Sequence, residues 1–503
     1  MSGYQAQLGE FERQHRSIDV RQSPVRDRVD HALIGSALAR VRWELDTLQS
    51  WRRQPSFYVD QSIGVLFDRL VVPSPFDDER SRAIIGTLEM VRRNLEQGRQ
   101  NLTGHAVAEF AEVTVHELRN VDNELHEVVK ALAPVMPHGF RDRLLAAYAD
   151  AAAALIEFRQ WLAQPKERFQ QWVPVGEKEL VRFLRTVALM PFTPDTLVDL
   201  AKLEYARATT LSVIEGTRPG GRVSTVFSDV DAQVRREAED EATIRRFYVE
   251  RGILSQPETL GRYLTAPIPS YLAPISWLGV TDDLTSDGRL SENSNSYVPD
   301  PSSELPYFYA ANACDPRLGV IHEGAHYQQL ALSWRHPDPI RRHYYDSGPN
   351  EGIAFYNEEL MLQAGLFDDS ATSRALIYSF MRLRALRVEV DVRLALGDIG
   401  LDEARDYLAT NAPMDLATAA EEAASFAASP GQGLSYQAGK TQIQSFLAEV
   451  VMECGRSFDL QDFHDYLWLN GNVPISLLRV EYLEAISANA TKRVRGSAQY
   501  PVA

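Results

Sequence analysis

The chain has 503 residues, 45% of them hydrophobic, so it is long enough to bury a large core. Its 52 basic and 69 acidic residues give a net charge of −17, which disfavours binding to nucleic acid or to an anionic membrane surface. We therefore expect a monomer or small homo-oligomer, with neither nucleic acid nor a membrane among its partners. The first residues lack the apolar stretch of a signal peptide, and no run of about 18 uncharged apolar residues occurs. Together with only two cysteines, this predicts a cytoplasmic protein.

Helical patterns dominate the chain in order. Residues 80–102 and 140–163 place apolar side chains at helical spacing, and residues 193–216 begin with a Thr-Pro pair typical of a helix start. The polar segment 281–306 predicts a loop between a helical N-terminal region (1–280) and a metal-binding catalytic region (307–490), followed by a tail (491–503). "YFYAANA" at 307–313 predicts a short strand. We expect a mostly α fold: one large helical body with a small β element near residues 320–330.

Residues 320–330, "VIHEGAHYQQL", contain an HExxH pattern. On a helix, His322 and His326 project from the same face, so both can reach one metal ion. Neutral imidazoles suit Zn²⁺, and Glu323 can lie beside a water bound to the metal. The alternative is two histidines that serve only packing or solvation.

A third ligand is available 25 residues after His326. Glu351 opens an apolar helix in "DSGPNEGIAFYNEELML", the layout of glutamate-type zinc peptidases. A carboxylate in a first helical turn also favours the helix dipole without any metal. Combined with the HExxH pattern, the spacing predicts Zn²⁺ held by His322, His326 and Glu351. Glu358, seven residues later on the same helical side, is the expected support behind the ligands.

Motifs along nearly the whole chain resemble the domain of unknown function 885 family, which is related to helical HExxH zinc metallopeptidases of the gluzincin type. These motifs are "PSFYVDQSIGVLFDRL", "VGEKELVRFLR", "TPDTLVDLAKLEYAR", "VIHEGAHYQQ", "EGIAFYNEEL", "SPGQGLSYQAGK" and "FHDYLWLNGNVPISLLR". The resemblance implies a helical metallopeptidase-like body. The chain departs from many members, which carry Pro-Gly before a His-His pair; here Tyr327 stands at the second of those histidines. The ligand assignment therefore rests on spacing.

Other candidate site residues follow the metal motif. Because helical metallopeptidases often place a late tyrosine over the zinc, the resemblance makes Tyr436 the expected donor to an oxyanion. Lys440, four residues on, is the candidate for a substrate carboxylate, and Arg479 is a second candidate for the same task. Tyr345 lies between the two ligand helices and is expected to line the cleft. A core tyrosine and solvated cations are the alternatives.

These residues predict a zinc metallohydrolase that cleaves a peptide or small amide substrate, with Glu323 as the general base. A carboxypeptidase or dipeptidase mode is preferred. An aminopeptidase mode is the alternative, because the carboxylates of Glu351, Glu358 and Glu359 could instead bind the free amine of a substrate. Two other classes also remain: a hydrolase or lyase acting on a non-peptide metabolite, and a non-catalytic helical binding protein.

Overall fold

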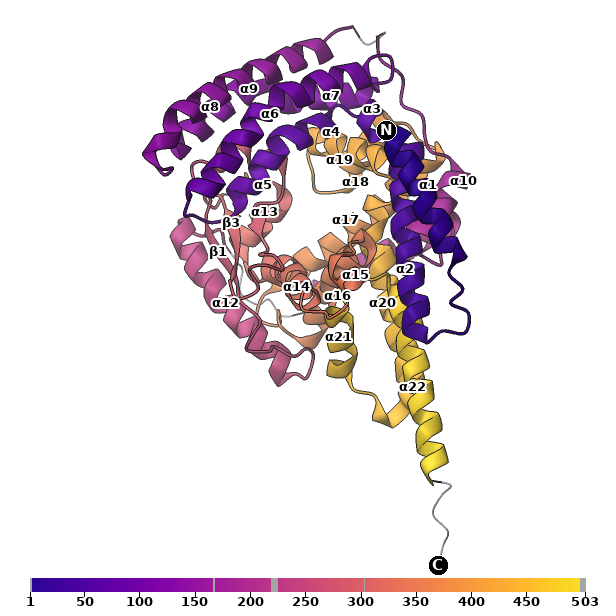
Figure 1. Cartoon of the computed structure of the whole chain (residues 1–503). Coiled ribbons are helices and arrows are strands. Elements are labelled where there is room, and N and C mark those ends of the chain that lie inside the picture. Colours follow the sequence, from indigo (N-terminus) through magenta and orange to yellow (C-terminus); the bar gives the residue numbers. More distant parts are fainter. Residues whose placement is uncertain (1, 166–167, 219–224, 303, 498–503) are drawn as a thin grey trace, which may run out of the picture.

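Helices make up most of the regular structure in this computed structural model, which describes residues 2–165, 168–218, 225–302 and 304–497. The predicted mostly α-helical fold with one small β element is confirmed. In Figure 1, α6 to α9 form a layer at the top, α12 and the sheet lie at the left, and α14 and α16 lie near the middle.

The N-terminal helices follow the predicted patterns closely. The helix that starts after Thr193 is capped by that side chain, which accepts a hydrogen bond from the Thr196 amide. The α-helices of this region are α1 (Ser2–Ser17), α2 (Val25–Arg42), α3 (Ser50–Arg53), α4 (Ser56–Val59), α5 (Val65–Val71), α6 (Asp78–Leu102), α7 (Ala108–Glu117), α8 (Val121–Leu132), α9 (Arg141–Leu162), α10 (Glu177–Arg182), α11 (Pro194–Glu215) and α12 (Val230–Glu250).

The C-terminal helices surround the HExxH segment. They are α13 (Tyr307–Cys314), α14 (Arg317–Ser333), α15 (Pro339–His343), α16 (Ser347–Ala364), α17 (Ala371–Leu396), α18 (Leu401–Asn411), α19 (Leu416–Ala428), α20 (Gln432–Cys454), α21 (Leu460–Leu469) and α22 (Ile475–Ser497). Ile244 and Tyr248 of α12 belong to the same hydrophobic cluster as Ile321 of α14 and Phe355 of α16. The two predicted regions therefore share a core.

The β element comes from a different part of the sequence than predicted. Strands β1 (Tyr263–Pro267), β2 (Asp282–Asp283) and β3 (Ser294–Val298) form a sheet in the order β1-β3-β2. β1 pairs in parallel with β3, and β2 pairs antiparallel with it. The segment 281–306, expected to be a loop, thus contributes two strands, whereas 307–313 is helical and forms most of α13. The expected tail is also partly wrong, because α22 continues to Ser497; residues 498–503 lie outside the described part.

Two glycines let α16 and α20 approach each other closely. A Cβ atom on Gly352 would lie 2.6 Å from the Gly439 Cα atom, and one on Gly439 would lie 2.1 Å from the Gly348 carbonyl oxygen. Both distances are far below van der Waals contact. The contact fixes Glu351, at the start of α16, relative to Tyr436 on α20.

Gly439→Ala is expected to lower the stability of the protein by about 1–3 kcal/mol, because the added methyl overpacks this contact. The matched control is Gly86→Ala in α6, where a Cβ would meet nothing within 4 Å. There alanine should stabilise the helix by up to about 1 kcal/mol. Thermal unfolding of both variants checks the prediction; equal melting temperatures would contradict the close packing.

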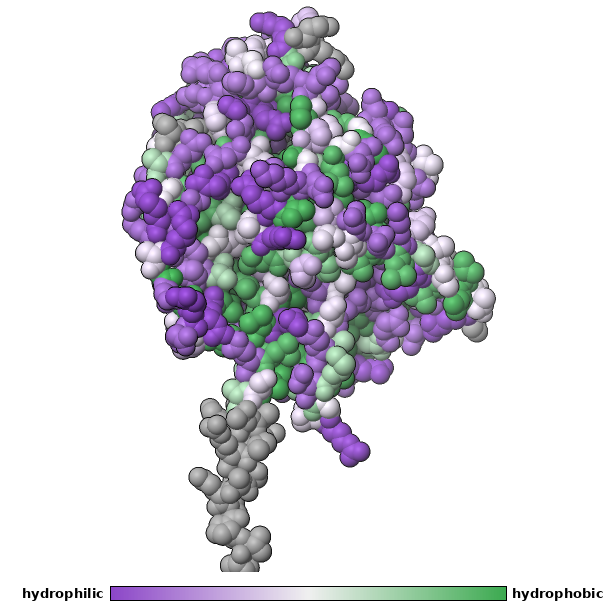
Figure 2. All heavy atoms as spheres, turned by 90° about the vertical axis from the view of Figure 1, so that its right-hand side faces the viewer, coloured by the Kyte–Doolittle hydropathy of each residue, from purple (hydrophilic) through white to green (hydrophobic). Residues whose placement is uncertain are grey.

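Hydrophobic and hydrophilic residues are mixed on the surface. Figure 2 shows hydrophobic residues scattered among hydrophilic ones on the face that lies to the right in Figure 1. Exposed apolar side chains include Phe11 and Ile18 in or just after α1, and Met452 near the end of α20. Among the described helices, none combines the length and the apolar character needed to cross a membrane.

Candidate metal centre

α14 and α16 bring the three predicted ligands together. Glu351 Oε2 lies 3.6 Å from His322 Nε2 and 3.5 Å from His326 Nε2. Within the described residues, these three form the one group of histidine, cysteine and acidic side chains whose ligand atoms all lie within 4.8 Å of one another. The predicted residues therefore converge on a single point between the two helices.

The local sequence explains this convergence. The Asp346 side chain accepts a hydrogen bond of 2.8 Å from the Gly348 amide and so starts α16 one turn before Glu351. Farther along α16, the buried Asn357 side chain donates to the Ile321 carbonyl at 2.6 Å, next to the first ligand of α14. Both ligand helices are thereby fixed in register.

The spacing of the three ligand atoms fits zinc. Four ligands at about 2.0–2.2 Å in a tetrahedron lie roughly 3.3–3.5 Å from one another. The observed separations of 3.5 and 3.6 Å to Glu351 Oε2 are close to these values. That oxygen is buried and has no hydrogen-bond partner among the described residues, and the same holds for Nδ1 of His326. Two imidazoles and one carboxylate leave a fourth position for water or substrate.

The charges also favour a cation at this point. Burial alone would lower the pKa of His322, but the neighbouring carboxylates of Glu351 and Glu358 raise it to about 9. Burial would raise the pKa of Glu351, yet the neighbouring imidazoles of His322 and His326 hold it well below its ordinary value. The carboxylates of the cluster thus stabilise a positive charge beside them. A divalent cation bound between the three side chains would provide that charge.

Glu358 lies behind the first histidine. Its Oε1 atom is 2.7 Å from Nδ1 of His322 and 2.8 Å from Nη2 of Arg384. A hydrogen bond from Nδ1–H to Glu358 leaves the Nε2 lone pair directed at the ligand point. Glu358 therefore occupies the supporting place that its spacing from Glu351 predicted.

A cleft of about 320 Å³ opens beside the ligands. His322 and Glu323 of α14 line it, and Tyr436 of α20 lies on another wall. The ring of Tyr436 is nearly parallel to that of His322, at an interplanar angle of 18° and with the centroids 6.5 Å apart. Burial, followed by the charge of Glu351, raises the pKa of Tyr436 well above its ordinary value, so the hydroxyl keeps its proton at neutral pH. The cleft thus contains both predicted catalytic side chains.

Asp282 of β2 is a cleft residue that the sequence did not reveal. It is half-buried and accepts hydrogen bonds from the Tyr263 hydroxyl at 2.8 Å and the Ser296 hydroxyl at 2.7 Å. Burial and the charge of Glu323 raise the pKa of Asp282 to about 7. Because strand pairing alone brings this polar segment to α14, no spacing in the sequence indicated it.

Arg384 and Arg387 of α17 also line the cleft and were also missed. A sequence signal for them does exist. Both arginines lie within "FMRLRALRVEV", where apolar residues alternate with charged ones, and charged residues flanked by core residues on a long helix are typical of buried functional groups.

Three predicted substrate-binding residues lie elsewhere, which corrects their assignment. Lys440 is completely buried and pairs with Glu204 and Glu359 at 2.6 and 2.8 Å, so its charge is already neutralised away from the cleft. Arg479 pairs with Glu449 of α20. Tyr345 is largely exposed and lines a separate hollow.

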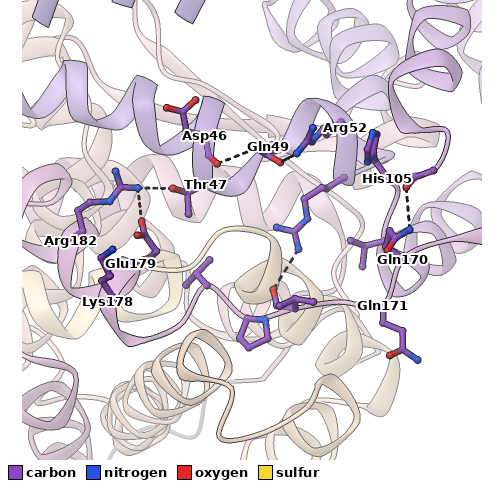
Figure 3. A pocket seen from close by; sticks show the side chains of 16 residues that line it. Asp46, Thr47, Gln49, Arg52, His105, Gln170, Gln171, Lys178, Glu179 and Arg182 are labelled. Carbon is purple, nitrogen blue, oxygen red and sulfur yellow. Dashed lines mark hydrogen bonds and ion pairs between the residues drawn. The ribbon is translucent and has the colours of Figure 1, made fainter. Parts of the chain in front are cut away.

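A larger hollow of about 1020 Å³ lies away from these ligands, between the N-terminal helices and α10. Several of its side chains bond to neighbouring side chains or backbone carbonyls, as Figure 3 shows, whereas Gln171 and Lys178 have no bond drawn to them. Arg182, for example, donates to the Thr47 hydroxyl and pairs with Glu179, both at 2.6 Å. Among the described residues, this hollow has no group of converging ligand atoms like that of His322, His326 and Glu351.

Two solved structures share this fold. A "putative lipoprotein of unknown function" from Shewanella oneidensis aligns with a TM-score of 0.68 at 18% identity, over 95% of this chain and 91% of that chain. A "putative lipoprotein" from Colwellia psychrerythraea aligns with a TM-score of 0.68 at 14% identity, over 96% and 90%. These descriptions contradict the predicted cytoplasmic location. That prediction rested on the first residues and the cysteine count, and neither property determines the compartment.

Sequence comparison supports the family resemblance for the C-terminal motifs alone. No curated protein matches the chain. Residues 307–481, which contain all three ligand positions as well as Glu323 and Tyr436, match the family described as "Bacterial protein of unknown function (DUF885)".

Proposed function

We propose that the protein is a zinc-dependent hydrolase that cleaves peptide or related amide bonds. The observation that carries the proposal is the convergence of His322, His326 and Glu351 beside a cleft that also contains Glu323. When bound there, zinc would supply a Lewis acid for the scissile carbonyl and an activated water. The remaining chemistry belongs to the side chains of the cleft.

Glu323 is the proton carrier in this proposal. It follows the first ligand on α14, is half-buried, and lines the cleft. From that place its carboxylate can take a proton from the attacking water and deliver it to the leaving amine. A protein that used this fold only for binding would have no need of a carboxylate between two ligands.

Tyr436 is the proposed donor to the developing oxyanion. Its hydroxyl stays protonated at neutral pH, and its ring lies beside that of His322, with the centroids 6.5 Å apart. A preorganised donor at the point where negative charge develops is typically worth about 2.7–4 kcal/mol in the transition state.

The dimensions of the cleft support short substrates. At about 320 Å³ it falls at the lower end of the range for small-molecule pockets. A di- or tripeptide fits such a volume better than a folded chain does, which favours the carboxypeptidase or dipeptidase mode. A small non-peptide amide would fit equally well.

The metal part of the proposal predicts close to one zinc ion per chain. His322→Ala and His326→Ala should each reduce the zinc content to a small fraction, because two ligands alone do not hold zinc tightly. Elemental analysis of the purified proteins measures this directly. His464→Ala is the control, because that histidine is buried beside Tyr356 and lies outside the cluster. Full zinc occupancy in both ligand variants would place the site elsewhere.

The chemical part is tested by digesting a peptide library with free and blocked termini. We expect cleavage by the zinc-loaded protein and none by the His322→Ala variant. If the loaded protein cleaves no peptide, a hydrolase or lyase of a non-peptide metabolite becomes the better assignment.

A further inference from the structure

Two arginines line one wall of the cleft. Arg384 and Arg387 lie three residues apart on α17 and both line the cavity, whereas Glu323 and Asp282 come from α14 and β2. The two arginine side chains are only 3% and 12% exposed. The nitrogen atoms of a buried guanidinium group require hydrogen-bond acceptors.

The hydrogen-bonding capacity of these arginines is not exhausted. Arg384 Nη2 donates to Glu358 at 2.8 Å, but its Nε and Nη1 atoms are buried without a hydrogen-bond partner among the described residues. Arg387 uses Nε and Nη2 for Glu422; its Nη1 atom is not among the fully buried ones and remains available to a ligand in the cleft. Buried donors without acceptors are unfavourable and rare in native structures. A ligand that brings acceptor oxygens to this wall would satisfy them.

The surroundings define what that ligand carries. The guanidinium carbon atoms of Arg384 and Arg387 lie 5.3 and 5.6 Å from the ring centroid of Tyr436, and 5.3 and 5.7 Å from that of Phe308. Aromatic rings at these distances hold the two guanidinium groups in place and leave their N–H groups free to donate hydrogen bonds. A planar group with two acceptor oxygens, such as a carboxylate, matches the paired N–H groups of a guanidinium. Glu323 and Asp282, across the cleft, repel such a group toward α17.

We propose that Arg384 and Arg387 form a subsite for a carboxylate of the substrate, so that the cleft acts on short peptides or related amides with a free carboxylate. The inference rests on the proposed hydrolase function and assigns to α17 the task that the sequence suggested for Lys440. Arg384 also contacts Glu358, which supports His322. The test therefore uses Arg387, which contacts neither.

The first measurement uses protein freed of metal, so that no cleavage interferes. Calorimetry compares an N-acetylated alanyl-alanine dipeptide with a free C-terminus and the same dipeptide amidated. Wild type should bind the free acid roughly ten- to a hundredfold more tightly. In Arg387→Met the ratio should fall to near one, and in Arg387→Lys, which keeps the charge but not the fork, it should be intermediate. Equal affinity of wild type for the two forms, or binding of neither, overturns the subsite.

Two control variants separate the subsite from the packing around it. Glu422→Gln removes the partner of Arg387 but keeps the guanidinium, so the preference for the free acid should persist. Arg393→Met removes an arginine from the last turn of the same helix, outside the cleft, and should leave the ratio as in wild type. Loss of the preference in either control equal to that in Arg387→Met would contradict the assignment.

The second measurement is kcat/KM of zinc-loaded protein for longer peptides with free and amidated C-termini. We expect wild type to favour the free C-terminus by the same roughly ten- to a hundredfold ratio of kcat/KM, and Arg387→Met to reduce that ratio to near one. Cleavage of both forms at equal rates by wild type rejects the subsite while the hydrolase stands. A binding preference that depends on Arg387, without any cleavage, rejects the hydrolase while the subsite stands.

Discussion

Glu323→Gln is expected to keep its zinc and lose turnover by a factor of about 10² or more, which corresponds to at least about 2.7 kcal/mol in the transition state. Glutamine has nearly the same shape as glutamate but cannot accept a proton at neutral pH. The three ligands are untouched by this change, so binding of the metal and chemistry are separated.

The measurement pairs zinc analysis with kcat for one cleavable peptide. Glu292→Gln is a matched control, because Glu292 is largely exposed on a loop outside the cleft. Turnover at the wild-type level in Glu323→Gln would remove the proton-carrying role. Loss of zinc in that variant would instead mean that Glu323 helps to hold the metal.

The sequence was sufficient for the parts of the site that depend on one or two helices. His322 and His326 are four residues apart on one helix, so their convergence needs no tertiary information. Glu351 follows at the start of the next helix, and the Asp-Ser-Gly-Pro stretch before it marks that start. Glu358 follows from helical spacing once Glu351 is placed. Local rules therefore predicted that these side chains converge.

Local rules failed where distant segments decide the structure. The aromatic run at 307–313 suits a strand, yet Tyr307 and Phe308 both pack against the ring of Phe380 on α17, and the segment folds as a helix. β2 contains only two residues, and its pairing with β3 defines it. Asp282 reaches the cleft through that pairing, which explains why the polar segment looked like a loop.

Lys440 illustrates the same limit for charges. Its helical spacing from Tyr436 suggested a shared face, but the two carboxylates that neutralise it come from other helices. Glu204 is 236 residues away along the chain, and Glu359 belongs to α16. Nothing near Lys440 in the sequence indicates these partners, so a solvated or substrate-binding lysine was the natural interpretation.

Lys440→Met is therefore expected to destabilise the protein by about 3–5 kcal/mol, the range for breaking a buried ion pair on one side. Glu204 and Glu359 would remain buried, and their pKa values are held below the ordinary range largely by Lys440 and Arg207, against the effect of burial. Arg207 pairs with both glutamates and would neutralise only part of the charge left behind.

Denaturant unfolding of wild type, Lys440→Met and the double variant Lys440→Met/Glu204→Gln measures this effect. The double variant should recover part of the lost stability, because it removes one of the uncompensated carboxylates. Lys178→Met, at an exposed position of α10, is the control and should change stability by no more than about 0.5 kcal/mol. The folded fraction of Lys440→Met should still prefer a free over an amidated C-terminus, because Lys440 does not reach the cleft. If Lys440→Met kept wild-type stability but lost the preference for a free C-terminus, Lys440 would bind the substrate carboxylate. That result would contradict its buried pairing with Glu204 and Glu359.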